Sequence, residues 1–340
     1  MRIQLVTQMW PSPENPDLGS FLVPLAAELE RRANAVEVTA ISRRGGPPTK
    51  YGGLVARSIA AARRFRPDVV FAHFLFPAGA AGVAASLAGR CPLVVMAHGT
   101  DVTNLTSIRG VRAATAGVIA RSAAVIANSH WLAERLAAAI PAAAEKTEIA
   151  DCGIDLAAFE PLDAVLARER TGWDGEGPAF LCVGSLIERK NVVALADAFA
   201  TLGRGRLAFV GDGPLRPRLE DRKGVRIVGR IAQREVPDWV GACDVLCQPS
   251  IAEPFGQATL EGMAMERTVV ATKNGGPPEF VPPEAGVLVD PRDGAALSEA
   301  LERAASMPAP NPAARAAAAR HDVKAEATKM LAVLERAAAQ

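Results

Sequence analysis

Residues 179–211 have the sequence AFLCVGSLIERKNVVALADAFATLGRGRLAFVG, and this stretch decides the fold. It begins with a short apolar strand pattern, AFLCVG, and ends with another, RLAFVG. The segment between them, VVALADAFATL, has the composition of a packed helix. Strands that are apolar on both faces and joined by a helix are typical of a parallel sheet covered on both sides. The stretch therefore predicts an α/β fold.

The same alternation of strand and helix patterns runs along the whole chain. Helical patterns lie at 22–32, 105–123 and 295–305. Further strand patterns lie at 2–7, 36–42, 68–74, 92–98, 124–129, 225–230, 244–250, 268–273 and 286–290. Because the alternation occurs in two series, we expect two Rossmann-like, doubly wound parallel-sheet domains.

The length of 340 residues fits two domains of about 100 to 200 residues each. Strand patterns stop at 156–176, where Pro, Gly and charged residues mix, and we place the boundary there. We expect a first domain at 1–160, a second at 161–320, and a final helix within 321–340 that packs back on the first domain. One face of that helix carries Val323, Ala327, Met330, Leu331 and Leu334. Ligands of such sheets bind beyond the carboxyl ends of the strands, so we expect a cleft between the domains.

The composition limits the classes of partner. Lys and Arg number 38 and Asp and Glu 37, which leaves a net charge of +1 and no overall cationic field for nucleic acid. Five scattered cysteines without a C-x-x-C pair favour a reduced, cytoplasmic protein. The N-terminal segment MRIQLVTQMWPSPENPD predicts a strand and a loop rather than a secretion signal.

Two features bear on membranes. Residues 69–89 carry no charge, but Pro77 and many small residues favour a buried strand that turns into an Ala-rich helix over a transmembrane segment. Basic clusters at 31–32, 43–44 and 63–66 fit a solvated face, and a peripheral contact with the inner membrane face is the alternative.

The stretch richest in candidate functional residues is PSIAEPFGQATLEG at 249–262, which follows a strand pattern and opens a helix. Gly256 allows the backbone to approach a ligand closely, and the start of a helix favours a phosphate. Glu261 is placed to accept hydrogen bonds from sugar hydroxyls. On the residues alone, Glu253 and Glu261 are equally compatible with ordinary surface carboxylates.

In context, this stretch resembles the retaining glycosyltransferases of family 4, which have the GT-B fold. The resemblance covers nearly the whole chain through motifs in a characteristic order. They are HGTDV (98–102), VIANS (125–129), CGID-x3-F (152–159), VGSLIERKN (183–191), VGDGP (210–214), VGRI (228–231) and EPFGQATLEGMA (253–264). The resemblance implies a transferase that moves a hexose from a nucleotide diphosphate to an acceptor hydroxyl.

The resemblance also implies the donor-binding residues. Lys190 matches the lysine that holds the diphosphate, Glu261 the carboxylate on the ribose, and Glu253 the carboxylate beside the transferred sugar. The remaining matched donor positions are Gly184, Ser185, Arg189, Gly211, Arg230, Ile231, Phe255, Gly256, Gln257 and Ala258. Ser185 stands where the family often has Arg, which removes one phosphate contact.

In the first domain, His98 matches the catalytic loop that approaches the donor sugar, and Asp101 follows it as an acceptor-binding candidate. Gly19 and Ser20 match the first strand-to-helix turn, which shapes the acceptor site. His73 and His130 are expected to be structural. Asn34 stands at a turn where Gly-His is common in the family.

The catalytic residues expected from the resemblance are therefore His98, Lys190 and Glu253, in a front-face mechanism. No Asp-x-Asp follows a strand, so no metal and no cofactor is expected beyond the nucleotide-sugar co-substrate. The acceptor is left open as a small molecule, a glycan or a lipid-linked group. The alternative function is a nucleotide-sugar or phosphosugar binding protein without turnover. A dinucleotide oxidoreductase needs G-x-G-x-x-G, which is absent after the first strand, and VGDGP at 210–214 lacks the third glycine and the acidic residue that should follow it.

Overall fold

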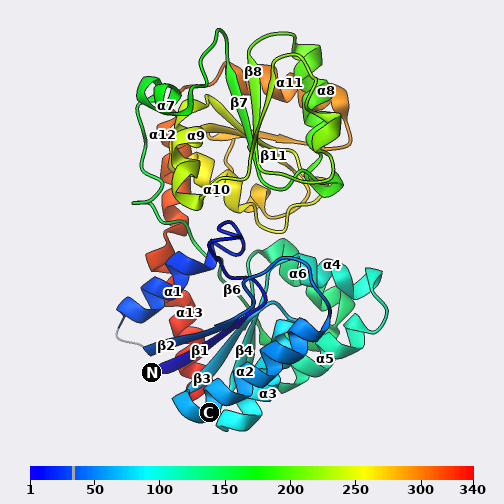
Figure 1. Ribbon diagram of the computed structural model, residues 1–340, viewed down its shortest axis with the longest axis vertical. Helices are drawn as coiled ribbons and strands as arrows, with labels where there is room; N and C mark the ends of the chain where they lie inside the picture. The colour runs from blue at the N-terminus through cyan, green and yellow to red at the C-terminus, as the bar shows by residue number, and fades with distance from the viewer. Residues whose placement is uncertain (33–34) are drawn as a thin grey trace. The chain divides into compact units, whose positions relative to one another are not determined.

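Each half of the chain builds a six-stranded parallel sheet with helices around it (Figure 1). This computed structural model describes residues 1–32 and 35–340. The turn at Asn34, where Gly-His is common in the family, therefore lies outside the described residues. The strand order is β2-β1-β3-β4-β5-β6 in the first sheet and β12-β11-β10-β7-β8-β9 in the second. The expectation of two doubly wound parallel sheets is confirmed.

The centre of the first sheet is buried on both faces, because β3 (Val69–His73) and β4 (Leu93–Ala97) consist of buried residues. Its remaining strands are β1 (Arg2–Thr7), β2 (Ala35–Ala40), β5 (Ala124–Ala127) and β6 (Thr147–Ile149). The helices of this unit are α1 (Leu22–Arg31), α2 (Thr49–Phe65), α3 (Ala78–Gly89), α4 (Thr100–Ser107), α5 (Val111–Arg121), α6 (His130–Ala139) and α13 (Val323–Ala338).

The second sheet follows the same plan with its own helices. Its strands are β7 (Ala179–Val183), β8 (Arg206–Val210), β9 (Val225–Gly229), β10 (Val245–Gln248), β11 (Thr268–Thr272) and β12 (Gly286–Val289). Its helices are α7 (Ala164–Thr171), α8 (Val192–Leu202), α9 (Val236–Ala242), α10 (Gln257–Ala264), α11 (Gly294–Ala305) and α12 (Pro312–Ala318). The strand order reverses between β7 and β10, which is where open α/β sheets bind ligands.

The chain divides into a unit of Met1–Gly153 with Val323–Gln340 and a unit of Ile154–Asp322. The division at Gly153 thus comes earlier than the expected boundary at residue 160. The final helix, α13, belongs to the first unit, where its apolar face joins the core formed by Ile3, Leu22 and Phe71. The residues expected on that face, Val323, Ala327, Met330, Leu331 and Leu334, are all buried.

Three local expectations can be compared with the structure. The helix predicted at 105–123 is two helices, α4 and α5, because Gly110 between them has a left-handed φ of 85°. Residues 69–89 form β3 and α3 as expected. Helix α2 was not predicted, because Gly52 and Gly53 interrupt its helical pattern.

Among the described residues, none of the helices is long and apolar enough to cross a membrane.

Candidate functional site

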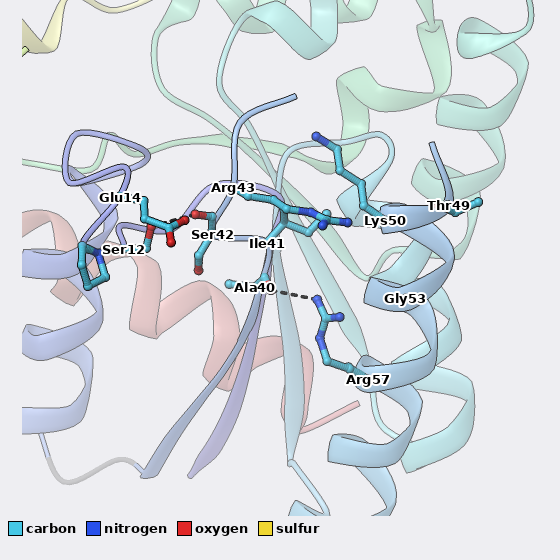
Figure 2. A pocket seen from close by; sticks show the side chains of 11 residues that line it. Ser12, Glu14, Ala40, Ile41, Ser42, Arg43, Thr49, Lys50, Gly53 and Arg57 are labelled. Atoms are coloured by element: carbon cyan, nitrogen blue, oxygen red, sulfur yellow. Dashed lines mark hydrogen bonds between the residues drawn. The ribbon is translucent and has the colours of Figure 1, made fainter. Parts of the chain in front are cut away.

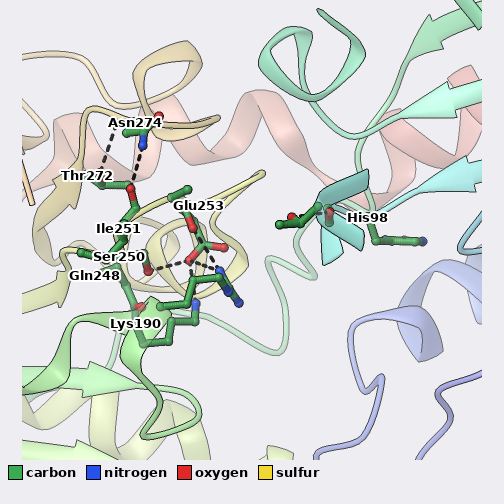
Figure 3. Close-up of polar contacts among 12 residues, drawn as sticks. His98, Lys190, Gln248, Ser250, Ile251, Glu253, Thr272 and Asn274 are labelled. Atoms are coloured by element: carbon green, nitrogen blue, oxygen red, sulfur yellow. Dashed lines mark hydrogen bonds and ion pairs between the residues drawn. The ribbon is translucent and has the colours of Figure 1, made fainter. Parts of the chain in front are cut away.

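The centre of the candidate donor site is an ion pair between Lys190 and Glu253 (Figure 3). Lys190 ends a short 3-10 turn after β7, and Glu253 lies in the loop after β10, so the pair forms where the strand order reverses. The Lys190 Nζ lies 2.6 Å from the Glu253 Oε2, and only 16% of the lysine side chain is exposed. The structure brings together two residues predicted separately.

Two further side chains support the Glu253 carboxylate. The Ser250 hydroxyl donates a hydrogen bond to Oε2 at 2.8 Å, and the Arg189 Nη1 lies 3.8 Å from the same oxygen. Burial by itself raises the pKa of the Glu253 carboxyl, but the charges of Lys190 and Arg189 and the two hydrogen bonds outweigh it and lower the pKa overall. Glu253 is therefore ionised at neutral pH.

The backbone of Glu253 is held by the loop after β11. Its N–H donates to the Asn274 carbonyl at 3.0 Å, and its carbonyl accepts from the Gly276 N–H at 2.9 Å. Gly275 lies between these partners with φ +147°, and a Cβ there would stand 1.9 Å from the Glu253 carbonyl oxygen. Only glycine allows this approach, so the loop fixes the direction of the Glu253 side chain.

A second close approach occurs between the loops after β7 and β8. Gly211 has φ +144°, and a Cβ at this position would lie 1.9 Å from the carbonyl oxygen of Gly184. Gly184 itself donates its N–H to the Val210 carbonyl at 2.8 Å. The expected donor-binding residues Gly184 and Gly211 thus pack backbone to backbone near Lys190, whose Cε lies 3.7 Å from the position of a Cβ on Gly184.

Glu261 lies in the second turn of α10 and is buried. Burial raises the pKa of its carboxyl to about 8, against the weaker lowering by a hydrogen bond that Gln233 Nε2 donates at 3.3 Å and by the charge of Lys190. The carboxyl is therefore mostly protonated at pH 7, unlike that of Glu253. This state differs from the ionised acceptor of hydrogen bonds expected from the sequence, because few partners compensate for the burial of Glu261.

The other expected donor residues surround this centre. Gly256 is the N-cap of α10 with φ 110°, and Gln257 and Ala258 form the first turn. The Phe255 ring is buried against Phe280, with centroids 5.2 Å apart, so only its backbone is open to a ligand role. The remaining three differ in exposure: Ser185 and Arg230 are exposed, and Ile231 is half-buried.

In the first unit, His98 follows β4 and its ring lies against His73 at the end of β3. The His98 Nε2 and the His73 Nδ1 are 3.0 Å apart, and the ring of Phe74 lies 4.5 Å from that of His98. Burial lowers the pKa of both imidazoles, so both rings are neutral at pH 7. Because His73 Nε2 is buried without a hydrogen-bond partner in the described part of the chain, the favoured tautomer carries its proton on Nδ1 and donates it to His98. The other ring nitrogen of His98 is then an N–H donor.

The expected acceptor contact of Asp101 is not supported by its surroundings. Its carboxylate is buried and accepts hydrogen bonds from the backbone N–H groups of Leu75 at 2.9 Å and Gly99 at 2.7 Å, and from those of His98 and Val102. Burial raises the pKa of Asp101, and these four bonds oppose the rise. With its oxygens engaged in this way, Asp101 shapes the His98 loop instead of facing a ligand.

The first strand-to-helix turn, at Gly19 and Ser20, needs glycine for its backbone conformation. Gly19 is left-handed with φ +69°, and a Cβ there would lie 2.6 Å from the Met9 carbonyl oxygen. Ser20 is half-buried immediately before α1. Both residues thus lie beyond the carboxyl end of β1, on the side of the sheet where His98 lies.

Sequence reasoning missed several residues of these sites. They are Ser250, which bonds to Glu253; Asn274 and Gly275, which hold its backbone; Gln233, which bonds to Glu261; and His73, which bonds to His98. The Asn-Gly-Gly sequence directly after β11 was an available signal, because such loops bring backbones close together. His73 could have been recognised in the sequence because it is a polar residue at the end of a buried strand pattern.

Two parallel-sheet units of these strand orders define a GT-B fold. Comparison with known proteins gives the family: residues 16–158 match the family described as Glycosyltransferase Family 4, and residues 177–306 match Glycosyl transferases group 1. The D-inositol 3-phosphate glycosyltransferase 1 of Catenulispora acidiphila is 30% identical over 75% of this chain and 68% of its own length. The chain belongs to glycosyltransferase family 4.

Solved structures agree with this fold. Sucrose-phosphate synthase from Thermosynechococcus elongatus superposes with a TM-score of 0.81 at 20% identity, over 99% of this chain and 98% of that one. HepE of Anabaena, in complex with UDP-glucose, superposes with a TM-score of 0.80 at 23% identity, over 99% and 100%. The matched region spans only 62% and 58% of the length of two other curated relatives.

Proposed function

We propose that this protein is a retaining glycosyltransferase that moves a hexose from a nucleotide diphosphate to an acceptor hydroxyl. The observation that carries the proposal is the Lys190–Glu253 pair at the point where the strand order of the second unit reverses. An ammonium group there neutralises a diphosphate, and the adjacent carboxylate accepts hydrogen bonds from sugar hydroxyls. The likeness to HepE, a structure that contains UDP-glucose, supports a nucleotide sugar as the donor.

In the proposed reaction, the acceptor oxygen attacks the anomeric carbon on the face from which the diphosphate leaves. The bond between that carbon and the diphosphate oxygen breaks, and the proton of the acceptor hydroxyl passes to the departing diphosphate. Lys190 and the first amides of α10 stabilise the charge that grows on the diphosphate. Glu253 positions the hexose and forms no covalent bond with it, because it is already engaged by Lys190 and Ser250.

Charge neutralisation in this proposal comes from protein cations instead of a metal ion. Lys190 and Arg189 both lie within 4 Å of the Glu253 carboxylate, so two positive charges face one negative charge before the donor binds. The surplus positive charge favours a diphosphate. Arg230 and Ile231 meet the nucleotide base through their backbone, which leaves the identity of the base open.

The function can be tested in two stages. Thermal shift with UDP-, GDP- and ADP-sugars identifies the donor, because a bound ligand stabilises the folded state by mass action. NMR of the product formed from that donor then reports the anomeric configuration. We expect the configuration of the donor to be kept. An inverted product rules out the retaining mechanism, and donor binding without transfer to any acceptor supports the alternative of a binding protein.

A further inference from the structure

One cavity of the first unit lies beyond the carboxyl ends of β1 and β2 (Figure 2). Its volume is about 660 Å³, within the range of small-molecule sites. The loop after β1 contributes Ser12 and Glu14, the end of β2 leads to Ser42 and Arg43, and α2 contributes Lys50 and Arg57. None of these residues belongs to the donor site or to the His98 loop.

The cavity gathers three positive charges, of Arg43, Lys50 and Arg57. In the described part of the chain, none of the three pairs with a carboxylate. The Lys50 Nζ donates to the Gly45 carbonyl at 2.6 Å, and the Arg57 Nη2 donates to the Ala40 carbonyl at 3.0 Å. Glu14 is the single acidic residue among those that line the cavity. The site therefore carries a surplus of positive charge.

Neighbouring arginines of the same unit show that this surplus is local. Arg44 pairs with Asp17, and Arg64 pairs with Glu37, so the cations on either side of the cavity are neutralised by carboxylates. Figure 2 shows Arg43 and Lys50 reaching into the same space, with Glu14 and Ser12 at its other side. Three cations that share a concave site repel one another unless an anion binds between them.

We propose that this cavity binds a phosphate group of the acceptor. A phosphate has three terminal oxygens and up to two negative charges, which suits two guanidinium groups, one ammonium group and the hydroxyls of Ser42 and Thr49. A single carboxylate would leave most of these donors without an acceptor. The proposal rests on the proposed function, because it assigns the substrate class of the acceptor half of that reaction.

The position of the cavity constrains the length of the acceptor. In the sheet order β2-β1-β3-β4, the cavity adjoins β2 and His98 follows β4, three strands away. With strands about 4.8 Å apart, the two strand ends are separated by about 14 Å. The phosphate therefore binds well away from the reacting hydroxyl. The acceptor must contain at least one further chemical group between its phosphate and that hydroxyl.

Calorimetry with inorganic pyrophosphate tests the cavity separately from the donor site. The titration is made on the full chain with Lys190→Met as background, so that pyrophosphate binding at the donor site is weakened. We expect the added substitutions R43Q, K50Q and R57Q to lower the remaining affinity at least tenfold. Arg63→Gln, an exposed change on the last turn of α2, is the matched control and leaves the affinity unchanged. Thermal unfolding of each variant confirms that the fold is intact.

Two probes separate the possible sources of the phosphate. If the acceptor is a small phosphorylated molecule, glycerol 3-phosphate displaces pyrophosphate, and the triple variant abolishes the displacement. If it is a lipid headgroup, the protein sediments with phosphatidylglycerol vesicles and not with phosphatidylcholine vesicles, and the triple variant loses this binding. Pyrophosphate affinity unchanged by the triple substitution, or competition by neither probe, overturns the proposal.

The same measurements distinguish a failure of this inference from a failure of the proposed function. If Lys190→Met leaves the pyrophosphate affinity of the otherwise unchanged protein intact, the donor site is refuted while the cavity stands. If the substitutions in the cavity have no effect but Lys190→Met does, the donor site stands and the phosphate-bearing acceptor is refuted.

Discussion

Replacing Lys190 by Met tests the electrostatics of the donor site through stability as well as binding. The substitution removes the cation that lies 2.6 Å from the Glu253 carboxylate and keeps most of the apolar side chain. Breaking a buried ion pair costs about 3 to 5 kcal/mol, because the remaining charge has no counterion. Here Ser250 at 2.8 Å and Arg189 at 3.8 Å still contact that oxygen, so we expect a loss of about 2 to 3 kcal/mol at pH 7.5.

The stability lost in Lys190→Met depends on pH through the ionisation of Glu253. In the unchanged protein the pKa of Glu253 is lowered below its usual 4.5, so its contribution to stability is present above pH 4.5 and is lost as the pH falls further. Without Lys190, burial dominates and we expect the pKa to rise above 4.5. The unfolded state then loses its proton more readily, and the variant becomes less stable as the pH rises through this range.

The assay is urea or thermal unfolding from pH 4 to pH 8. A loss of about 2 to 3 kcal/mol corresponds to a fall in Tm of about 4 to 12 °C for a domain of this size. We expect a small difference between the two proteins near pH 4 and the full difference at pH 7.5. The double variant K190M/E253Q removes the uncompensated charge and regains stability, but donor affinity stays at least tenfold reduced, which is about 1.4 kcal/mol. Equal destabilisation at pH 4 and pH 7.5 refutes the reasoning.

Four further predictions concern the same sites. Donor affinity measured by calorimetry should increase from pH 6 to pH 9, because Glu261 has a pKa of about 8 and accepts ribose hydroxyls once its carboxyl is ionised. Glu261→Gln should remove this pH dependence. A pH dependence that persists in the variant contradicts the assignment of Glu261. Gly275→Ala should lower the free energy of unfolding in urea by about 2 kcal/mol or more, because the residue has φ +147° and a Cβ would meet the Glu253 carbonyl oxygen. Gly294 has open space around it, so Gly294→Ala is the control and should not lower it. Equal effects of the two substitutions would be inconsistent with the loop geometry. His73→Leu should reduce kcat with little change in the KM for the donor, because the tautomer and position of His98 are lost; a change in KM alone would argue against this. Transfer should survive dialysis against EDTA, and a loss that Mg²⁺ restores would show that a metal is required.

The order of the strands along the chain could be predicted almost completely, and the reason is physical. Buried parallel strands need apolar residues on both faces, so patterns such as VVFAH in β3 are short and continuous and stand out from helices. The short edge strand β6 lacks such a pattern, because its middle residue, Glu148, is exposed. Helix α2 was missed for the same kind of reason, since Gly52 and Gly53 conceal its periodicity and packing compensates for them.

The sequence named the candidate site residues but not the contacts that they make in the structure. Lys190 and Glu253 are 63 positions apart, and their pairing depends on the adjacency of β7 and β10, which follows from strand order and not from local sequence. Asp101 is a second case in which the contacts could not be predicted. Its place in a motif suggested a ligand, but in a tight turn after β4 the nearest donors are backbone N–H groups, and four of them bond to its carboxylate.

The two carboxyl groups of this site have pKa values displaced in opposite directions, and this difference bears on where the proton of the acceptor goes. Glu253 has two cations and a hydroxyl around it and is ionised, whereas burial of Glu261 outweighs its hydrogen bond from Gln233 and the charge of Lys190, so Glu261 is mostly protonated at pH 7. A carboxylate held by Lys190 at 2.6 Å with a lowered pKa is a weak base, whereas Glu261, with a pKa of about 8, is a stronger base in the minor fraction that is ionised at pH 7. Of the two carboxyl groups, Glu253 is therefore the less suited to remove the acceptor proton. In the proposed front-face mechanism the proton passes instead to the diphosphate that leaves next to Lys190, and Glu261 keeps its proposed role at the ribose.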